Sequence, residues 1–133
     1  AGGSYYRYQQ HQIFVREEGA GKTLLLIHGF PTASWDWYLL WPKLEEKYHV
    51  IAPDLLGFGF SDKPRNYPYS ILDQANMIEA LLQHKKIERV KIISHDYGDT
   101  VAQELLARFN TRQNRGKAGL EISSSRGFWC YSR

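Results

Sequence analysis

Cysteine is almost absent from this sequence, because Cys130 is the only one among 133 residues. A single cysteine excludes an internal disulfide and a cysteine-rich metal site. No apolar run approaches the roughly 20 residues that a membrane-spanning helix needs, so we predict no membrane segment. Residues 1–4 lack the methionine, basic region and apolar core of a secretory signal peptide. These absences favour an intracellular protein, and we expect a cytoplasmic location.

Most of the chain has no excess of basic residues, although the formal net charge is +3. Residues 108–133 carry six of the 17 Lys and Arg residues and a single acid, Glu121, which leaves the preceding part mildly acidic. A nucleic-acid-binding surface needs a basic stripe, often with interleaved aromatic residues, and the part expected to fold has none. We therefore predict no nucleic-acid partner. The composition leaves the oligomeric state open.

Strand-like segments alternate with segments of helical periodicity. Mostly apolar, β-branched or leucine-rich runs predict strands that are buried on both faces. A four-residue recurrence of Val101, Leu105 and Phe109 predicts an amphipathic helix near the end of the chain. The expected strands lie at residues 5–18 (one or two antiparallel edge strands), 23–27, 48–52 and 90–93.

Two serines are expected to begin helices. Ser34 can cap a short aromatic-rich helix, and Ser70 with Asp73 three residues later forms a capping box. The residues expected to face the core are Trp35, Trp37, Leu40 and Trp41 in the first of these helices and Ala75, Ile78 and Leu82 in the second.

This alternation predicts an α/β fold, with a mostly parallel sheet and helices on both of its faces. In such sheets the ligand site lies outside the carboxyl ends of the strands. His28-Gly29, Asp54 and Asp96 each follow an expected strand. Three chemically reactive or conformationally special segments are therefore predicted at one edge of the sheet.

The segment around Asp96 organises the rest of this prediction. Ser94, Asp96 and Gly98 form small-x-Asp-x-Gly at a strand-to-helix junction, which is the pattern of a nucleophile elbow with aspartate at its apex. Such a sharp reversal leaves no room for large side chains two residues on either side of the apex. The positive end of the helix dipole favours a carboxylate there. Asp96 alone is equally consistent with an ordinary helix N-cap.

Three motifs resemble those of the α/β-hydrolase superfamily, in the branch of epoxide hydrolases and haloalkane dehalogenases. They are His-Gly-Phe-Pro at residues 28–31, the glycine-rich segment at 54–64 and Ser-His-Asp-Tyr-Gly at 94–98. Within that branch, residues 57–61, 94–99 and 101–106 are similar to the mesoderm-specific transcript proteins and their bacterial relatives.

The resemblance implies an enzyme mechanism with Asp96 as a carboxylate nucleophile that forms an ester with a small, apolar organic substrate. A histidine then activates water, and the backbone N–H groups of Phe30 and Tyr97 stabilise the resulting oxyanion. No cofactor and no metal are implied.

The resemblance also assigns supporting roles. Gly29 lets the oxyanion loop approach closely, and Pro31 fixes its turn. His28 is expected to shape this loop rather than act as the base, and Asp54 to brace the neighbouring turn. The side chain of His95 is expected to point away from that of Asp96.

The family pattern continues with strands, a cap domain, an acid and a late histidine that this sequence does not contain. We therefore expect residues 1–122 to form the N-terminal portion of an α/β-hydrolase domain. Residues 123–133 are expected to be an atypical tail, from a shifted reading frame or an alternative end. The strand at 90–93 is then expected to have a neighbour on one side only.

Phe30 and Tyr97 indicate which of the possible activities is favoured. Dehalogenases of this branch commonly carry tryptophan where Tyr97 stands and an amide side chain where Phe30 stands, so an epoxide-hydrolase-like activity is favoured. The alternatives are a haloalkane-dehalogenase-like hydrolase and a non-catalytic, truncated hydrolase fold. We expect no turnover by the chain itself, because no histidine follows Asp96.

Overall fold

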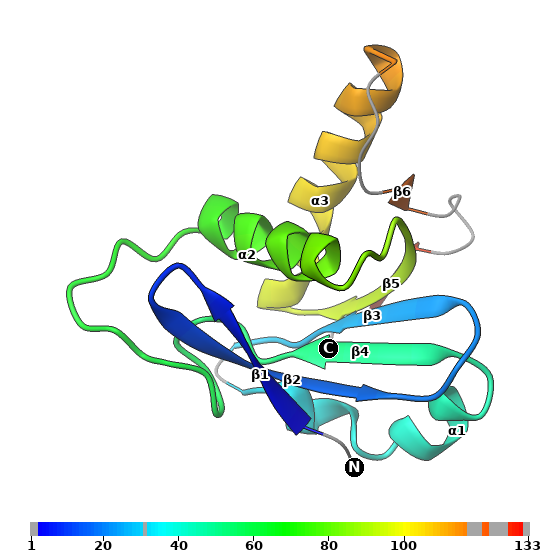
Figure 1. Cartoon of the computed structure of the whole chain (residues 1–133), viewed down its shortest axis with the longest axis horizontal. Coiled ribbons are helices and arrows are strands. Elements are labelled where there is room, and N and C mark those ends of the chain that lie inside the picture. The colour runs from blue at the N-terminus through cyan, green and yellow to red at the C-terminus, as the bar shows by residue number, and fades with distance from the viewer. Residues whose placement is uncertain (1–2, 31, 117–120, 123–127, 132–133) are drawn as a thin grey trace.

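The computed structural model describes residues 3–30, 32–116, 121–122 and 128–131. No helix within these ranges is both long enough and apolar enough to cross a membrane. The elements, shown in Figure 1, are β1 (Gly3–Tyr8), β2 (His11–Glu18), β3 (Thr23–Ile27), η1 (Ser34–Trp37), α1 (Trp41–Glu45), β4 (His49–Pro53), α2 (Ile71–His84), β5 (Arg89–His95), α3 (Tyr97–Asn114), β6 (Glu121–Ile122) and β7 (Phe128–Tyr131).

One mixed sheet runs through the molecule in the order β1-β2-β4-β3-β5-β6, and β7 also pairs with β5. β2 is antiparallel to both of its neighbours, β1 and β4. β3 is parallel to both of its neighbours, β4 and β5. The predicted α/β class and the antiparallel strands at residues 5–18 are therefore confirmed. The parallel arrangement puts the ends of β3, β4 and β5 at the same edge of the sheet.

The core lies on both faces of the sheet, because successive strand residues point to opposite sides. In β3, Leu25 and Ile27 pack into one cluster, and Leu24 and Leu26 pack into the other. The first cluster includes buried residues of α2 and α3, and the second includes Trp37 and Trp41. Helical segments therefore cover both faces, as expected.

The first helical segment differs from its prediction. Ser34 does not cap it: Ala33 is the N-cap, and the Ser34 N–H donates to Asp54 Oδ1 at 2.7 Å instead. Trp37 is buried, but Trp35 is 60% exposed. A 3-10 helix has about three residues per turn, so residues 35 and 37 cannot share a face. Leu40, 48% exposed, also faces outward, whereas Trp41 is buried as expected.

The prediction that Ser70 caps the helix α2 is confirmed. Ser70 Oγ accepts a hydrogen bond from Asp73 N–H at 3.0 Å. The Asp73 carboxylate accepts from the hydroxyl groups of Tyr8, at 2.7 Å, and Tyr67. These bonds tie β1 and the 54–70 loop to the start of α2. Burial, followed by the bond to Asp73, raises the pKa of Tyr67 to about 12.

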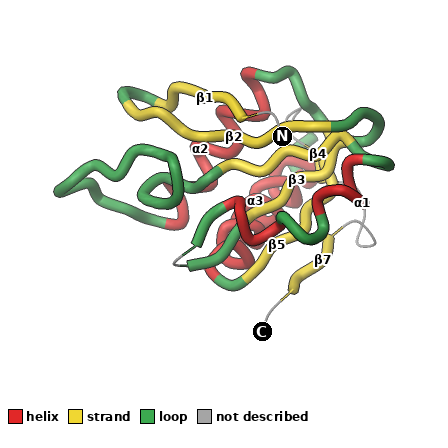
Figure 2. The backbone as a smooth tube through the Cα atoms, turned by 90° about the horizontal axis from the view of Figure 1, so that it is seen from below, coloured by secondary structure: helices red, strands yellow, loops and turns green. Residues whose placement is uncertain are grey.

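The strand β5 was expected to have a neighbour on one side only, and the structure differs. β6 and β7 pair with β5 in parallel, with Val90 opposite Ile122 and Ile92 opposite Phe128. Figure 2 shows β7 beside β5 near the C-terminus. The prediction that β5 has a neighbour on one side only is therefore wrong. The aromatic residues in 128–131 have strand propensity, and the open edge of β5 supplies hydrogen-bonding partners. Residues 123–127 lie outside the described residues, and the origin of the tail stays a prediction.

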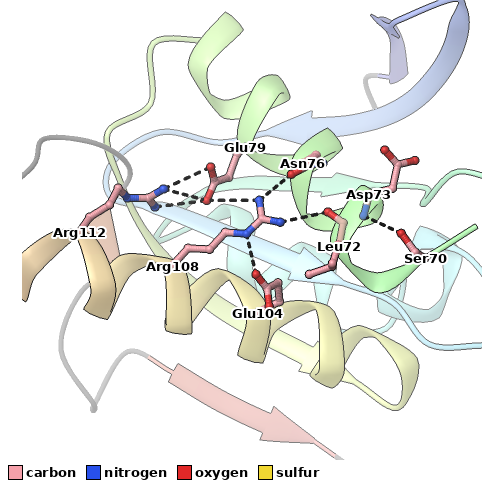
Figure 3. A network of polar contacts seen from close by, with 8 residues as sticks. All are labelled: Ser70, Leu72, Asp73, Asn76, Glu79, Glu104, Arg108 and Arg112. Atoms are coloured by element: carbon pink, nitrogen blue, oxygen red, sulfur yellow. Dashed lines mark hydrogen bonds and ion pairs between the residues drawn. The ribbon is translucent and has the colours of Figure 1, made fainter.

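A polar network that the sequence analysis did not anticipate fixes α3 against α2 (Figure 3). Arg108 donates to Glu104 Oε2 at 2.7 Å, to Asn76 Oδ1 at 2.8 Å and to the Leu72 carbonyl at 3.1 Å. Arg112 forms a two-pronged ion pair with Glu79, with nearest N–O distances of 3.2 Å. The network sets the direction in which α3 leaves the sheet.

A second charged cluster joins β2, β4 and the end of α2. Glu17 Oε2 lies 2.5 Å from His49 Nε2, and Glu17 Oε1 lies 2.6 Å from Lys85 Nζ. Burial opposes the charge of Glu17, but hydrogen bonds from Lys85 and His49 outweigh it and lower the pKa of this carboxyl.

Candidate active site

Asp96 occupies an unusual backbone conformation between β5 and α3, with φ 54° and ψ −119°. A side chain with a Cβ is strained there, typically by about 1–3 kcal/mol. An ordinary N-cap residue is extended and accepts from the second or third N–H of its helix. Asp96 instead accepts from the first, that of Tyr97, at 2.5 Å. The carboxylate is exposed. Asp96 is therefore the N-cap of α3, but not with the geometry of an ordinary cap.

Two glycines allow the elbow to interlock with the end of β3. A Cβ on Gly98 would lie 2.5 Å from the carbonyl oxygen of His28, and closer still to that of Ile27. A Cβ on Gly29 would lie 2.7 Å from Asp96 Cβ. These approaches are closer than real Cβ atoms tolerate. The close contact between α3, β3 and the loop after β3 therefore requires glycine at positions 98 and 29.

Ser94 and Asp99 connect the two sides of the elbow. Ser94 is buried, and its hydroxyl donates to Asp99 Oδ1 at 2.7 Å. Asp99 lies in the first turn of α3, where a carboxylate complements the helix dipole. The bond ties the last part of β5 to the beginning of α3. Ser94 was predicted only as a small residue, so its hydrogen bond is an additional finding.

His28 is fully buried, and both ring nitrogens have partners. Its Nε2 accepts from Leu55 N–H at 2.9 Å, and its Nδ1 lies 2.8 Å from the Gly29 carbonyl oxygen. An acceptor Nε2 and a donor Nδ1 define a neutral imidazole. This arrangement supports the loop-shaping role expected for His28. The following Phe30 is 65% exposed, and Pro31 lies outside the described residues.

Asp54 is buried and braces two segments. Its Oδ1 accepts from Ser34 N–H at 2.7 Å, and its Oδ2 accepts from Phe60 N–H at 2.9 Å. Its carbonyl oxygen accepts from the Ser61 hydroxyl at 2.6 Å. These bonds hold the segment after β3 and the glycine-rich loop together.

Phe58 lies at the centre of an aromatic group that the sequence analysis missed. Its ring centroid is 5.2 Å from that of His28, 5.8 Å from that of Phe30 and 5.9 Å from that of Tyr97. The available signal was a single aromatic residue between Gly57 and Gly59. Phe58 brings the three predicted motifs into mutual contact.

Tyr97 and Gln74 form a second unanticipated contact. Burial raises the pKa of the Tyr97 hydroxyl, while a hydrogen bond with the Gln74 side chain opposes the rise. Gln74 lies on the buried face of α2, four residues before Ile78 and seven before Leu81. A glutamine on an otherwise apolar helix face was the signal that could have identified it.

The histidines differ in their distance from the elbow. His95 Cδ2 is 3.0 Å from the point where a Gly29 Cβ would stand, so its imidazole lies beside the same loop as Asp96. His11 and His84 contact tyrosine rings of the β1 and α2 region, and His49 pairs with Glu17. His28 and His95 are therefore the histidines placed beside the elbow.

Comparison with known proteins agrees with this fold. The α/β hydrolase fold family matches residues 22–115. The mesoderm-specific transcript homolog protein of Bos taurus is 51% identical over 120 residues, which cover 85% of this chain and 35% of that protein. An epoxide hydrolase from Vigna radiata superposes with a TM-score of 0.81 at 25% identity, over 97% of this chain and 39% of that one.

A haloalkane dehalogenase variant from Bradyrhizobium elkanii superposes with a TM-score of 0.75 at 32% identity, over 80% of this chain and 36% of that one. The present chain thus spans about a third of the length of the curated relatives that it matches. The matched residues 22–115 contain both the Gly29 loop and the Asp96 elbow. The family match over residues 22–115 and the 51% identity to the Bos taurus relative show that the chain belongs to the α/β hydrolase fold family.

Proposed function

We propose that this chain carries the nucleophile of a cofactor-independent hydrolase, in which Asp96 forms a covalent ester with a small, apolar epoxide. The observation that carries the proposal is the exposed Asp96 carboxylate at a positive φ, beside the Gly29 loop. A strained residue is retained where the surrounding structure and its function require it.

In the first step, one carboxylate oxygen of Asp96 attacks a ring carbon of the epoxide. The bond between that carbon and the ring oxygen breaks, and the released alkoxide takes a proton from water. The Tyr97 N–H, which donates to Asp96 Oδ1, orients the carboxylate and leaves Oδ2 for the attack. Orientation of this kind lowers the entropic part of the barrier.

In the second step, water attacks the carbonyl carbon of the ester, and the carbonyl oxygen becomes negative. The N–H groups of Phe30 and Tyr97 are the proposed donors to this oxyanion. The attacking water must lose a proton to a base. Both nitrogens of His28 are engaged, so His28 is unsuited to that task. We therefore propose that this chain stops at the ester, with the base supplied elsewhere in a full-length hydrolase.

A haloalkane-dehalogenase-like activity is the second candidate, because the dehalogenase from Bradyrhizobium elkanii shares the fold at 32% identity. The same Asp96 attack would then release a halide. The Tyr97 side chain is half-buried and carries a phenol instead of an indole, so it has no side-chain N–H to donate to a halide. This is why the epoxide is favoured.

The proposal is tested by intact-protein mass spectrometry after incubation with styrene oxide. We expect a single stable adduct on Asp96 and its absence in Asp96→Asn, with Asp62→Asn as an exposed carboxylate control. An unmodified parent protein would overturn the aspartate-nucleophile proposal. Adduct formation with 1-bromohexane and bromide release, but none with the epoxide, would favour the dehalogenase candidate. Formation of many diol molecules per protein would contradict the stalled ester, and His95→Gln would then identify the base.

A further inference from the structure

Gln74 is a buried amide whose hydrogen bonds hold the loop after β4. It is 2% exposed and lies on the apolar face of α2. Its Oε1 accepts from Leu56 N–H at 3.1 Å, and its Nε2 donates to the Leu56 carbonyl at 2.9 Å. One side chain therefore satisfies both backbone groups of a residue that is itself buried.

Gln74 thus ties α2 to the loop after β4. An apolar residue of similar size would fill the space but leave these buried polar groups without partners, at a substantial cost.

The loop held by Gln74 leads directly to Phe58. The backbone N–H of Phe58 donates to the Leu55 carbonyl at 2.9 Å, which closes a turn around Leu56. The Phe58 ring in turn contacts the rings of Phe30 and Tyr97. Displacement of Leu56 would therefore move the ring that lies between the two residues whose N–H groups are the proposed oxyanion donors.

We infer that Gln74 is a positioning residue, which holds the Phe30 and Tyr97 N–H groups in register by fixing the turn that carries Phe58 between them. The inference rests on the proposed function, because it assigns Gln74 a task in the same oxyanion site. Gln74 does not touch the reacting atoms and acts through Leu56 and Phe58.

The test compares variants with the parent by amide hydrogen exchange. Gln74→Leu removes both hydrogen bonds between the amide and Leu56. Gln83→Leu is the matched control, because Gln83 lies on the same helix and is exposed. We expect roughly tenfold faster exchange at the amides of Phe58 and Tyr97 in Gln74→Leu, because both N–H groups are hydrogen-bonded in the parent. The amides of Leu25 and Ile51, in the sheet, serve as internal references.

A second variant separates positioning from general loosening. Gln74→Glu retains an acceptor for the Leu56 N–H but not the amide donor to the Leu56 carbonyl, so we expect a smaller acceleration than in Gln74→Leu. The control Gln83→Leu should match the parent.

The inference would be overturned by unchanged exchange at Phe58 and Tyr97, or by equal acceleration at Leu25 and Ile51. If Gln74→Leu does not fold, Gln74→Glu decides by the same criteria. Absence of an Asp96 ester in the parent would refute the proposed function alone, because exchange is measured without substrate. Where the ester forms, its rate of formation should fall in Gln74→Leu and not in Gln83→Leu.

Discussion

Gly98→Ala tests the contact on which the elbow depends. Within a helix, alanine is favoured over glycine by up to about 1 kcal/mol, so local propensity predicts stabilisation. The new methyl group would lie 2.5 Å from the carbonyl oxygen of His28 and closer to that of Ile27. Both atoms belong to the backbone at the end of a central strand and cannot rotate away. Overpacking of this kind costs about 1–3 kcal/mol, so the steric term is expected to exceed the propensity term.

We expect Gly98→Ala to lose about 2 kcal/mol of unfolding free energy, which corresponds to a fall in Tm of roughly 6–10 °C for a chain of this size. The assay is urea and thermal denaturation followed by tryptophan fluorescence, since Trp37 and Trp41 are buried. Thr100→Ala is the matched control, because Thr100 is exposed in the same first turns of α3 and should change stability by less than about 0.5 kcal/mol. A variant as stable as the parent would refute the close approach of α3 to β3.

Three further perturbations test the polar contacts. Arg108→Met should lower the unfolding free energy by about 1–2 kcal/mol in urea denaturation, less at high salt, whereas the exposed Arg115→Met should not. Asp54→Asn should lower the unfolding free energy by about 2–3 kcal/mol in the same assay, because the amide NH₂ would face one of the two backbone N–H groups that Asp54 now accepts from. A variant as stable as the parent would contradict the bracing role. The folded protein lowers the pKa of Glu17 below the ordinary 4.5. The ionised Glu17 carboxylate therefore stabilises the folded state above pH 4.5, and this contribution is lost as the pH falls through the folded-state pKa. Glu17→Gln should therefore flatten the loss of stability between pH 5 and pH 2 by up to about 1 kcal/mol, as measured by denaturation across that range.

The local sequence was sufficient to predict the strands and the helix in which apolar residues recur regularly. The apolar runs at 23–27 and 90–93, and the spacing of Ala75, Ile78 and Leu82, predicted strands and a helix that the structure contains. The site edge was also predictable, because parallel strands place their carboxyl ends together. Asp96 between Ser94 and Gly98 was recognisable as an elbow pattern, since the steric demand is local to five residues.

Other features depended on contacts between distant segments. Ser34 has the chemistry of a helix cap, but the buried Asp54 carboxylate, 20 residues away, takes its N–H. Gln74 has no local signature beyond its place on an apolar face, and its two Leu56 bonds depend on how α2 lies against the loop after β4. The choice between cap and elbow at Asp96 likewise required its backbone angles. Periodicity is a property of neighbouring residues, whereas a buried hydrogen bond depends on the register between elements, and only the tertiary structure sets that register.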